Sequence, residues 1–400
     1  MFEFTPTLSM SEQWTDNFNQ TSSNKLTNLR TTVGPGGNFV INGPTTKGII
    51  SSNAGLTYDT APDSSNFNVF PTITAAIQQT LSPRLSLTLT NTYVRNNNPS
   101  NSDQFGLNTQ RQTYSSNSFS LGVSYLIDLI STQAYYRNSA YYTGGSNGNN
   151  TSSNIIGLGA STQVGLYNTV SLGYEFSWSD TSGASSGNNS GQSTGNLFTA
   201  SVARQTGTYS SIGIQGSYQQ NSPPQQDAQH LWNVSAFSTY GLPSGLSLSG
   251  SIGFSLLTQG NQSNQTGVTS NSSLSYSFGP AAVSVGIFSG FRQTGLDGQN
   301  FGLVQTSAYT ASFLYAFTPL IAGSVQATYS QNEPTGSGNN SSGSESSTFS
   351  SGATLSWQLL RWLSLSANYS YLLLSNPNGS LTGSGTIPVN TATISLGATF

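Results

Sequence analysis

Charged side chains are rare in this sequence, so the few that fall inside predicted β-strands are the best candidates for chemistry. Only 6% of the 400 residues are charged. Arg137, Glu175 and Arg292 each fall on the polar phase of an alternating segment, where side chains point away from the apolar face. Fixed charges among neutral groups bias the passage of ions. We therefore take these three residues as candidates for lining a water-filled interior and selecting ions there.

Arg137 and Glu175 fall at similar heights above predicted tight turns, with one strand between them. Either the two charges help to form a constriction, or they form a compensated pair without a part in selectivity. The sequence leaves both interpretations open.

The remaining residue types do not indicate catalysis. The chain has one histidine and no cysteine. A serine nucleophile would therefore have only that histidine as its usual base, and disulfides and thiolate sites are excluded. His230 shares the apolar phase of Trp232 and Val234 at one end of a predicted strand, so we interpret it as a rim residue. We expect no enzyme, no cofactor and no metal centre.

Acidic and glycine-rich loops carry no clear ligand site. A calcium site needs several carboxylates or carbonyls close together, and we interpret Asp16, Asp59 and Asp63 as isolated, solvated acids. The run Gly34-Pro-Gly-Gly-Asn38 lacks the Lys and the Ser/Thr of a phosphate loop, so we interpret it as a bend. A net charge of −3 does not indicate a nucleic-acid partner.

The elements that must position these residues are strands with two different faces. In Thr169–Asp180, apolar and aromatic residues alternate with small polar ones, and successive strand side chains point to opposite faces. The same alternation recurs along the chain, most clearly at 85–93, 118–125, 273–278, 312–317, 354–358, 363–371 and 391–400.

Connections between these segments are alternately short and long. The short ones lie near Thr46, Pro83, Asp128, Tyr167, Gly207, Pro243, Pro280, Pro319 and Arg361, and the long ones are polar and rich in Ser, Asn and Gly. Nine short turns join nine pairs of strands, and the first and last strands bring the number to twenty. We therefore predict a barrel of about 18–22 strands, because membrane barrels combine short turns with longer outer loops.

The final segment, Thr391–Phe400, alternates throughout and ends on an aromatic residue in phase with its apolar face. It resembles the last strand of a bacterial outer-membrane β-barrel, and the whole chain, residues 1–400, is similar to porin-like barrels. The resemblance implies one transmembrane, antiparallel, up-and-down all-β barrel domain. Its short turns would be periplasmic, its long loops extracellular, and Phe400 part of the signal read by the barrel assembly machinery.

Composition supports this interpretation. Charged residues make up about 25% of an average soluble protein, far above the 6% found here, yet only 34% of the residues are hydrophobic. A barrel with one face toward lipid and one toward water explains both values. A propeller and a secreted β-solenoid are alternatives, but neither requires short and long connections in strict alternation.

No apolar run is long enough for a transmembrane helix, and no signal peptide is visible at Met1. We expect the numbering to start after a removed signal peptide or within a trimmed chain. No plug domain precedes the first predicted strand, which counts against a TonB-dependent transporter.

A neutral polar lumen predicts a porin-like channel for passive diffusion of small, mainly neutral hydrophilic solutes. The partners expected are lipid and lipopolysaccharide of the outer membrane, the assembly machinery and such solutes, and the prediction allows a homo-oligomer. A structural sleeve around an electron conduit or a polysaccharide export machine is one alternative. A surface adhesin that uses the Ser/Asn loops is another.

The phase assignment predicts unequal responses to two neighbouring substitutions. Leu172→Arg should destabilise the folded barrel by ~2–4 kcal/mol, the midplane cost of a lipid-facing Arg. Ser171→Arg should leave the folding free energy nearly unchanged, because its side chain points into water. Equal losses in urea unfolding from lipid vesicles would show that the phases are wrongly assigned.

Overall fold

The computed structural model describes residues 1–61, 66–98, 112–143, 149–183, 191–224, 227–260, 264–293, 303–334, 345–376 and 385–400. These residues form one sheet of twenty antiparallel strands and no α-helix. In the described part of the chain, no helix is long and apolar enough to cross a membrane. The prediction of an all-β fold with about twenty strands is confirmed.

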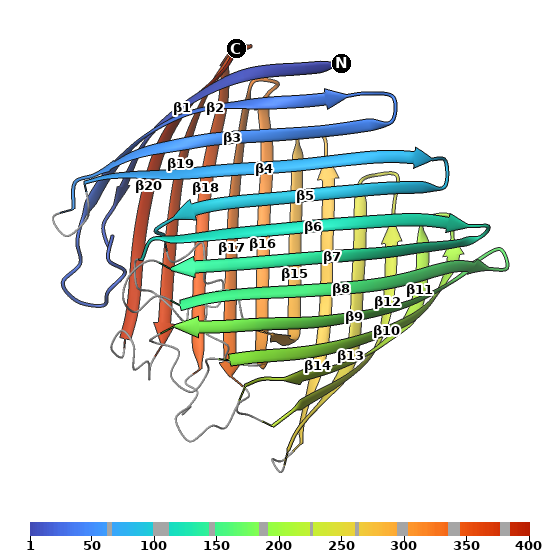
Figure 1. Ribbon diagram of the computed structural model, residues 1–400. Coiled ribbons are helices and arrows are strands. Elements are labelled where there is room, and N and C mark those ends of the chain that lie inside the picture. Colours follow the sequence, from blue (N-terminus) through green and yellow to red (C-terminus); the bar gives the residue numbers. More distant parts are fainter. Residues whose placement is uncertain are drawn as a thin grey trace.

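The strands follow one another around the sheet in chain order (Figure 1). Their bounds are β1 Phe2–Thr15, β2 Asn28–Asn42, β3 Thr46–Asp59, β4 Phe67–Ser82, β5 Leu85–Asn96, β6 Tyr114–Ile127, β7 Ile130–Thr143, β8 Asn149–Val164, β9 Asn168–Gly183, β10 Gly191–Gly207, β11 Ser210–Ser222, β12 Gln229–Gly241, β13 Leu246–Gln259, β14 Gln265–Phe278, β15 Ala281–Gln293, β16 Leu303–Thr318, β17 Ile321–Pro334, β18 Ser346–Leu360, β19 Leu363–Asn376 and β20 Gly385–Thr399.

Pairing between the first and last strands closes the sheet into a barrel. Antiparallel partners run from Thr7 opposite Thr399 to Thr15 opposite Thr391. Beyond the last pair, Asp16 accepts hydrogen bonds from the backbone N–H and the side-chain amide of Asn390, at 2.7 and 2.6 Å. Asp16 is therefore a closing contact of the seam rather than the isolated acid that we predicted.

Every predicted short turn lies at a connection of a few residues at the same end of the barrel. Both termini also lie at this end, which we call the short-turn end (Figure 1). Asp128 has a φ of 51° and Gly279 a φ of 55°, the left-handed conformation that tight hairpin turns require. The opposite, long-connection end carries the predicted long loops.

The glycine run of β2 corrects one prediction. Gly34–Gly37 continues the strand instead of forming a bend, and it pairs with β1 throughout. Pairing with β3 is interrupted at Gly34 and Pro35. Ser9 and Asn53 from the flanking strands donate hydrogen bonds to the Gly34 carbonyl at 3.2 and 3.1 Å. A side chain at Gly34 would collide with both, so glycine is what allows the strand to continue there.

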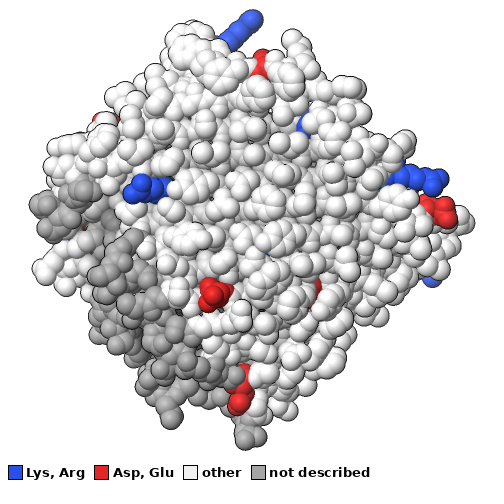
Figure 2. All heavy atoms as spheres, in the orientation of Figure 1, with Lys and Arg blue, Asp and Glu red and all other residues white. Residues whose placement is uncertain are grey.

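The apolar phase covers the outside of the barrel. Many large apolar side chains on this face are more than half exposed, among them Leu172, Ile214, Val234, Ile252 and Phe254. Figure 2 shows one outer face, on which charged side chains are few and widely separated. Such a surface would drive aggregation in water and suits the hydrocarbon of a bilayer.

Aromatic residues mark two levels on this outer surface. Exposed rings lie near the short-turn end at Tyr125, Tyr209, Tyr240, Tyr276, Trp357, Trp362 and Phe400. Toward the other end, tyrosine hydroxyls hydrogen-bond polar side chains of the next strand in the pairs Tyr136–Asn154, Tyr174–Asn196, Tyr218–His230 and Tyr369–Asn390, at 2.8, 2.8, 2.8 and 2.6 Å. Two such girdles flank the lipid band of membrane barrels.

The polar phase lines the inside, and its exposure changes along the strands. On β16, Val304 and Thr306 near the long-connection end are 0% and 3% exposed, whereas inward-facing Leu314 is 48% exposed. Two apolar clusters lie on the inner wall at the same buried end. They consist of Leu231 with Leu257, and of Leu374, Ile387 and Val389. The side chains of the inner wall are therefore buried at the long-connection end and exposed toward the short-turn end.

Candidate functional site

The predicted charges Arg137 and Glu175 come together on the inner wall, with Tyr135 as a third member. The strand register places Tyr135 of β7, Gly157 of β8 and Glu175 of β9 in one row across three strands. Arg137 lies two residues beyond Tyr135 on the same face. We call Tyr135, Arg137 and Glu175 the wall cluster.

Gly157 is what allows the wall cluster to form. A Cβ atom built at Gly157 would lie 2.1 Å from Cζ of Tyr135, so the ring occupies the space of the missing side chain. The Tyr135 hydroxyl thereby reaches across β8 and donates a hydrogen bond to Oε1 of Glu175.

Arg137 completes the cluster from the side of the long-connection end. Its Nη2 lies 3.2 Å from Oε1 of Glu175, and its guanidinium carbon lies 4.4 Å from the centroid of the Tyr135 ring. The Arg137 side chain is 47% exposed and the Glu175 side chain 30% exposed. A pair this exposed adds little stability, but it cancels most of the local charge. The arrangement has the form of the predicted compensated pair, and its part in ion selection stays a prediction.

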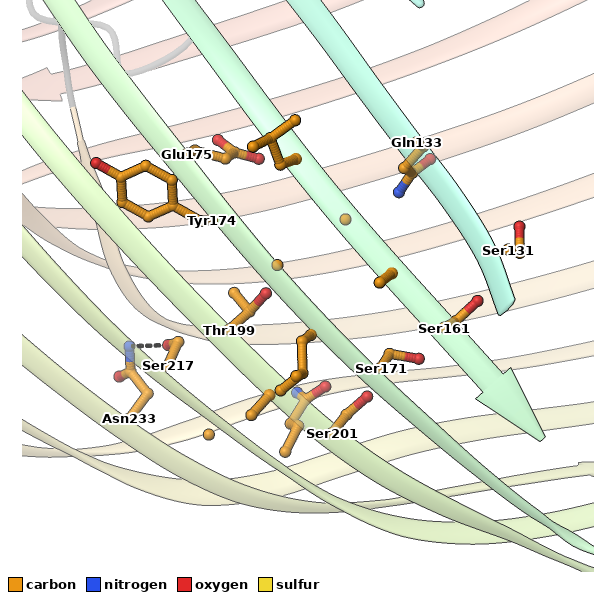
Figure 3. A pocket seen from close by; sticks show the side chains of 18 of the residues that line it. Ser131, Gln133, Ser161, Ser171, Tyr174, Glu175, Thr199, Ser201, Ser217 and Asn233 are labelled. Atoms are coloured by element: carbon orange, nitrogen blue, oxygen red, sulfur yellow. Dashed lines mark hydrogen bonds between the residues drawn. The ribbon is translucent and has the colours of Figure 1, made fainter. Parts of the chain in front are cut away.

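A polar hollow of about 600 Å³ lies beside the wall cluster on the inner face of β7–β12. Figure 3 shows it with Gln133, Ser161, Ser171, Thr199, Ser201 and Glu175 around it. The glycines Gly159 and Gly173 contribute to its lining, so backbone takes the place of side chains there.

Arg292, the third predicted charge, does not join this cluster. It faces inward near the long-connection end of β15, and its guanidinium carbon lies 3.9 Å from the ring centroid of Phe288. Arg292 therefore lies near the mouth of the barrel, away from the middle of the wall.

A second charged group at the long-connection end was missed at the sequence level. Arg30 of β2 donates two hydrogen bonds to Asp59 of β3, both at 2.8 Å. The Arg30 side chain is 11% exposed and that of Asp59 0% exposed. Asn28 donates a further hydrogen bond to Asp59 at 2.7 Å. The prediction that Asp59 is an isolated, solvated acid is wrong, and Asp63 lies outside the described residues.

Arg30 also anchors the connection between β1 and β2. Its guanidinium carbon lies 5.7 Å from the ring centroid of Phe18 and 5.5 Å from that of Phe70. Phe18 belongs to this connection and is 6% exposed. The buried ion pair thus holds the β1–β2 connection against the inner wall at the long-connection end.

His230 and Phe400 lie where the sequence placed them. His230 is on the outer face near the long-connection end, where its Nδ1 lies 2.8 Å from the Tyr218 hydroxyl. Phe400 is 67% exposed and stacks on Trp362 with ring centroids 5.9 Å apart. The assembly role of Phe400 stays a prediction. Within the described ranges, no three or more His, Cys, Asp or Glu side chains are grouped to hold a metal ion.

Comparison with solved structures gives barrels of the same kind. The siderophore receptor PirA from Pseudomonas aeruginosa matches with a TM-score of 0.56 at 9% identity, over 100% of this chain and 80% of its own. The ferric enterobactin receptor PfeA, in complex with BCV-L6, matches with a TM-score of 0.58 at 12% identity, over 100% of this chain and 81% of its own. The chain is an outer-membrane β-barrel protein.

The FrpB iron transporter from Neisseria meningitidis also matches this outer-membrane barrel, with a TM-score of 0.56 at 9% identity over 99% of this chain and 82% of its own. No family model and no curated protein matches the sequence. Identities this low relate the folds alone. The placement of the short turns in the periplasm and of the long connections outside the cell stays a prediction.

Removing one partner of the wall cluster should give opposite changes in ion selectivity. Arg137→Gln leaves Glu175 uncompensated and should shift selectivity toward cations, whereas Glu175→Gln leaves Arg137 uncompensated and should shift it toward anions. The measurement is the reversal potential across a salt gradient in planar bilayers. Both shifts should shrink near 1 M salt, where the screening length falls to ~3 Å.

The matched control is Arg292→Gln, which removes a charge near the mouth and leaves the wall cluster intact. Folded yield should not change in any of the three variants, because exposed charges add little stability. Unchanged reversal potentials for both wall variants at low salt would show that ions do not pass the wall cluster.

Proposed function

We propose that this outer-membrane barrel is a porin-like channel for passive diffusion of small, mainly neutral hydrophilic solutes, and that it catalyses no reaction. The exposure of the inner wall is the observation that carries the proposal. Side chains such as Gln133, Thr199 and Thr310 point inward and stay exposed, as expected for a water-filled lumen. Barrels of 16–18 strands already enclose an aqueous channel, and this one has twenty.

Near-neutrality of the lumen supports neutral solutes over ions. Arg137 is compensated by Glu175, and Arg30 is compensated by Asp59. Serine, threonine and amide side chains supply most of the remaining polar groups on the inner face. They exchange hydrogen bonds with water and with hydroxylated solutes alike, so they set no strong preference for charge.

The packed mouth should set the size limit. Buried side chains and the two apolar clusters lie at the long-connection end of the wall, which we predict to face outside the cell. A solute entering from outside therefore meets the most covered section first and the open section afterwards.

Uptake of a chelated metal is a second candidate, because the structural neighbours are named as siderophore receptors and an iron transporter. We place it second because the neighbours share only 9–13% identity with this chain. The lumen cations Arg30 and Arg137 are moreover already engaged by carboxylates.

Planar-bilayer conductance of the refolded protein tests the channel. We expect stepwise current increases with weak ion selectivity, and small neutral solutes should lower the conductance by entering the pore until a size cut-off is reached. Protein that inserts but passes no current, or that retains a bound partner protein through purification, would contradict the proposal and favour a sleeve.

A further inference from the structure

Several polar side chains that line the hollow on β7–β11 make no hydrogen bond to the protein, although Ser217, which also lines it, accepts one from Asn233 at 3.1 Å. Elsewhere on the inner wall some facing hydroxyls pair across strands, as in Ser211–Thr239, Ser249–Ser273 and Ser284–Ser312, each at 2.7 Å. Around the hollow, six inward side chains make no hydrogen bond to any described residue. They are Gln133, Ser161, Ser171, Thr199, Ser201 and Gln215.

These unpaired groups come from adjacent strands and line one volume. The register places Gln133, Gly159, Gly173 and Thr199 in one row, and Ser161, Ser171, Ser201 and Gln215 in the row below. Glu175 adds carboxylate oxygens at the upper edge of the volume, which is about 600 Å³. Pockets for small molecules span roughly 300–1,000 Å³, so the hollow is large enough for a ligand rather than a single water.

The chemistry of this lining fits a ligand with many hydroxyl groups. Serine and threonine hydroxyls and glutamine amides both donate and accept hydrogen bonds, and a carboxylate accepts them. A sugar presents hydroxyls that both donate and accept. Because Glu175 is already compensated by Arg137 at 3.2 Å, the hollow offers an ion little net attraction.

We propose that the hollow is a binding site for neutral saccharides, at which sugar units are held as they pass along the wall. This inference rests on the proposed channel and names its solute class. The two rows of unpaired groups beside the wall cluster form the site, and Gly159 and Gly173 leave space for the ligand because they have no side chains.

Two threonines in matching surroundings allow a controlled test. Thr199 lies beside Gly173, and Thr310 on the other wall lies beside Gly286. In each case the threonine Oγ1 is 2.6 Å from a Cβ built at the glycine. Both threonines are exposed on the inner face of mid-strand. Thr199→Trp fills the hollow, whereas Thr310→Trp adds the same bulk to the lumen elsewhere.

The experiment is isothermal titration calorimetry of the full chain in detergent with maltotriose, and with triglycine as a non-saccharide of similar length. Wild type should bind maltotriose saturably, and Thr199→Trp should weaken binding at least about tenfold because several hydrogen bonds are lost. Thr310→Trp should bind like wild type. The double variant Gln133→Met/Ser201→Ala removes hydrogen-bonding groups without adding bulk, and it should weaken binding as well.

The possible outcomes distinguish failure of the saccharide site from failure of the proposed channel. A wild type that conducts but does not bind maltotriose would overturn the saccharide site, as would equal losses in both tryptophan variants or equal binding of triglycine. A wild type that binds maltotriose but passes no current would overturn the channel and leave the site standing.

Discussion

Lipid supplies no hydrogen-bond partners, and this one constraint governs the rest of the structure. Every backbone N–H and C=O within the hydrocarbon must be paired by the protein itself, so a sheet that crosses the membrane has to close. The seam between β1 and β20 performs that closure over Thr7–Thr15. Asp16 extends the seam beyond the last pair by accepting two hydrogen bonds from Asn390. Where the ladder weakens at Gly34, side chains from both neighbouring strands satisfy the carbonyl instead.

Closure gives each strand one face toward lipid and one toward the lumen, and the unusual composition follows from this division. The outer face carries few charges (Figure 2), and the nearly neutral inner face also carries few, mostly in pairs. Tyr135 reaches Glu175 only because Gly157 leaves a gap, which shows how a residue without a side chain shapes the wall. Side chains that are buried at the long-connection end and exposed toward the short-turn end then divide the lumen into a covered mouth and an open wall.

The period-two pattern was sufficient to predict the strands, their faces and the number of short turns, because each depends on neighbours in the chain. It also placed Arg137 and Glu175 at matching heights. Contacts that depend on strand register could not be derived. The pairing of Arg30 with Asp59 and the crossing of Gly157 by Tyr135 both join separate strands. The continuation of β2 through Gly34 likewise depends on Ser9 and Asn53, which lie far from it in sequence.

The central claim is a closed barrel whose polar phase faces water and whose apolar phase faces lipid. The chain has no cysteine, so single cysteines can be placed one at a time from Val170 to Ser177 on β9. A charged, membrane-impermeant thiol reagent applied to the protein in lipid vesicles reports which side chains contact water. Rapid labelling at 171, 173, 175 and 177, with slow labelling at 170, 172, 174 and 176, is the predicted result. Labelling without a two-residue period, or with the phases reversed, would contradict the account.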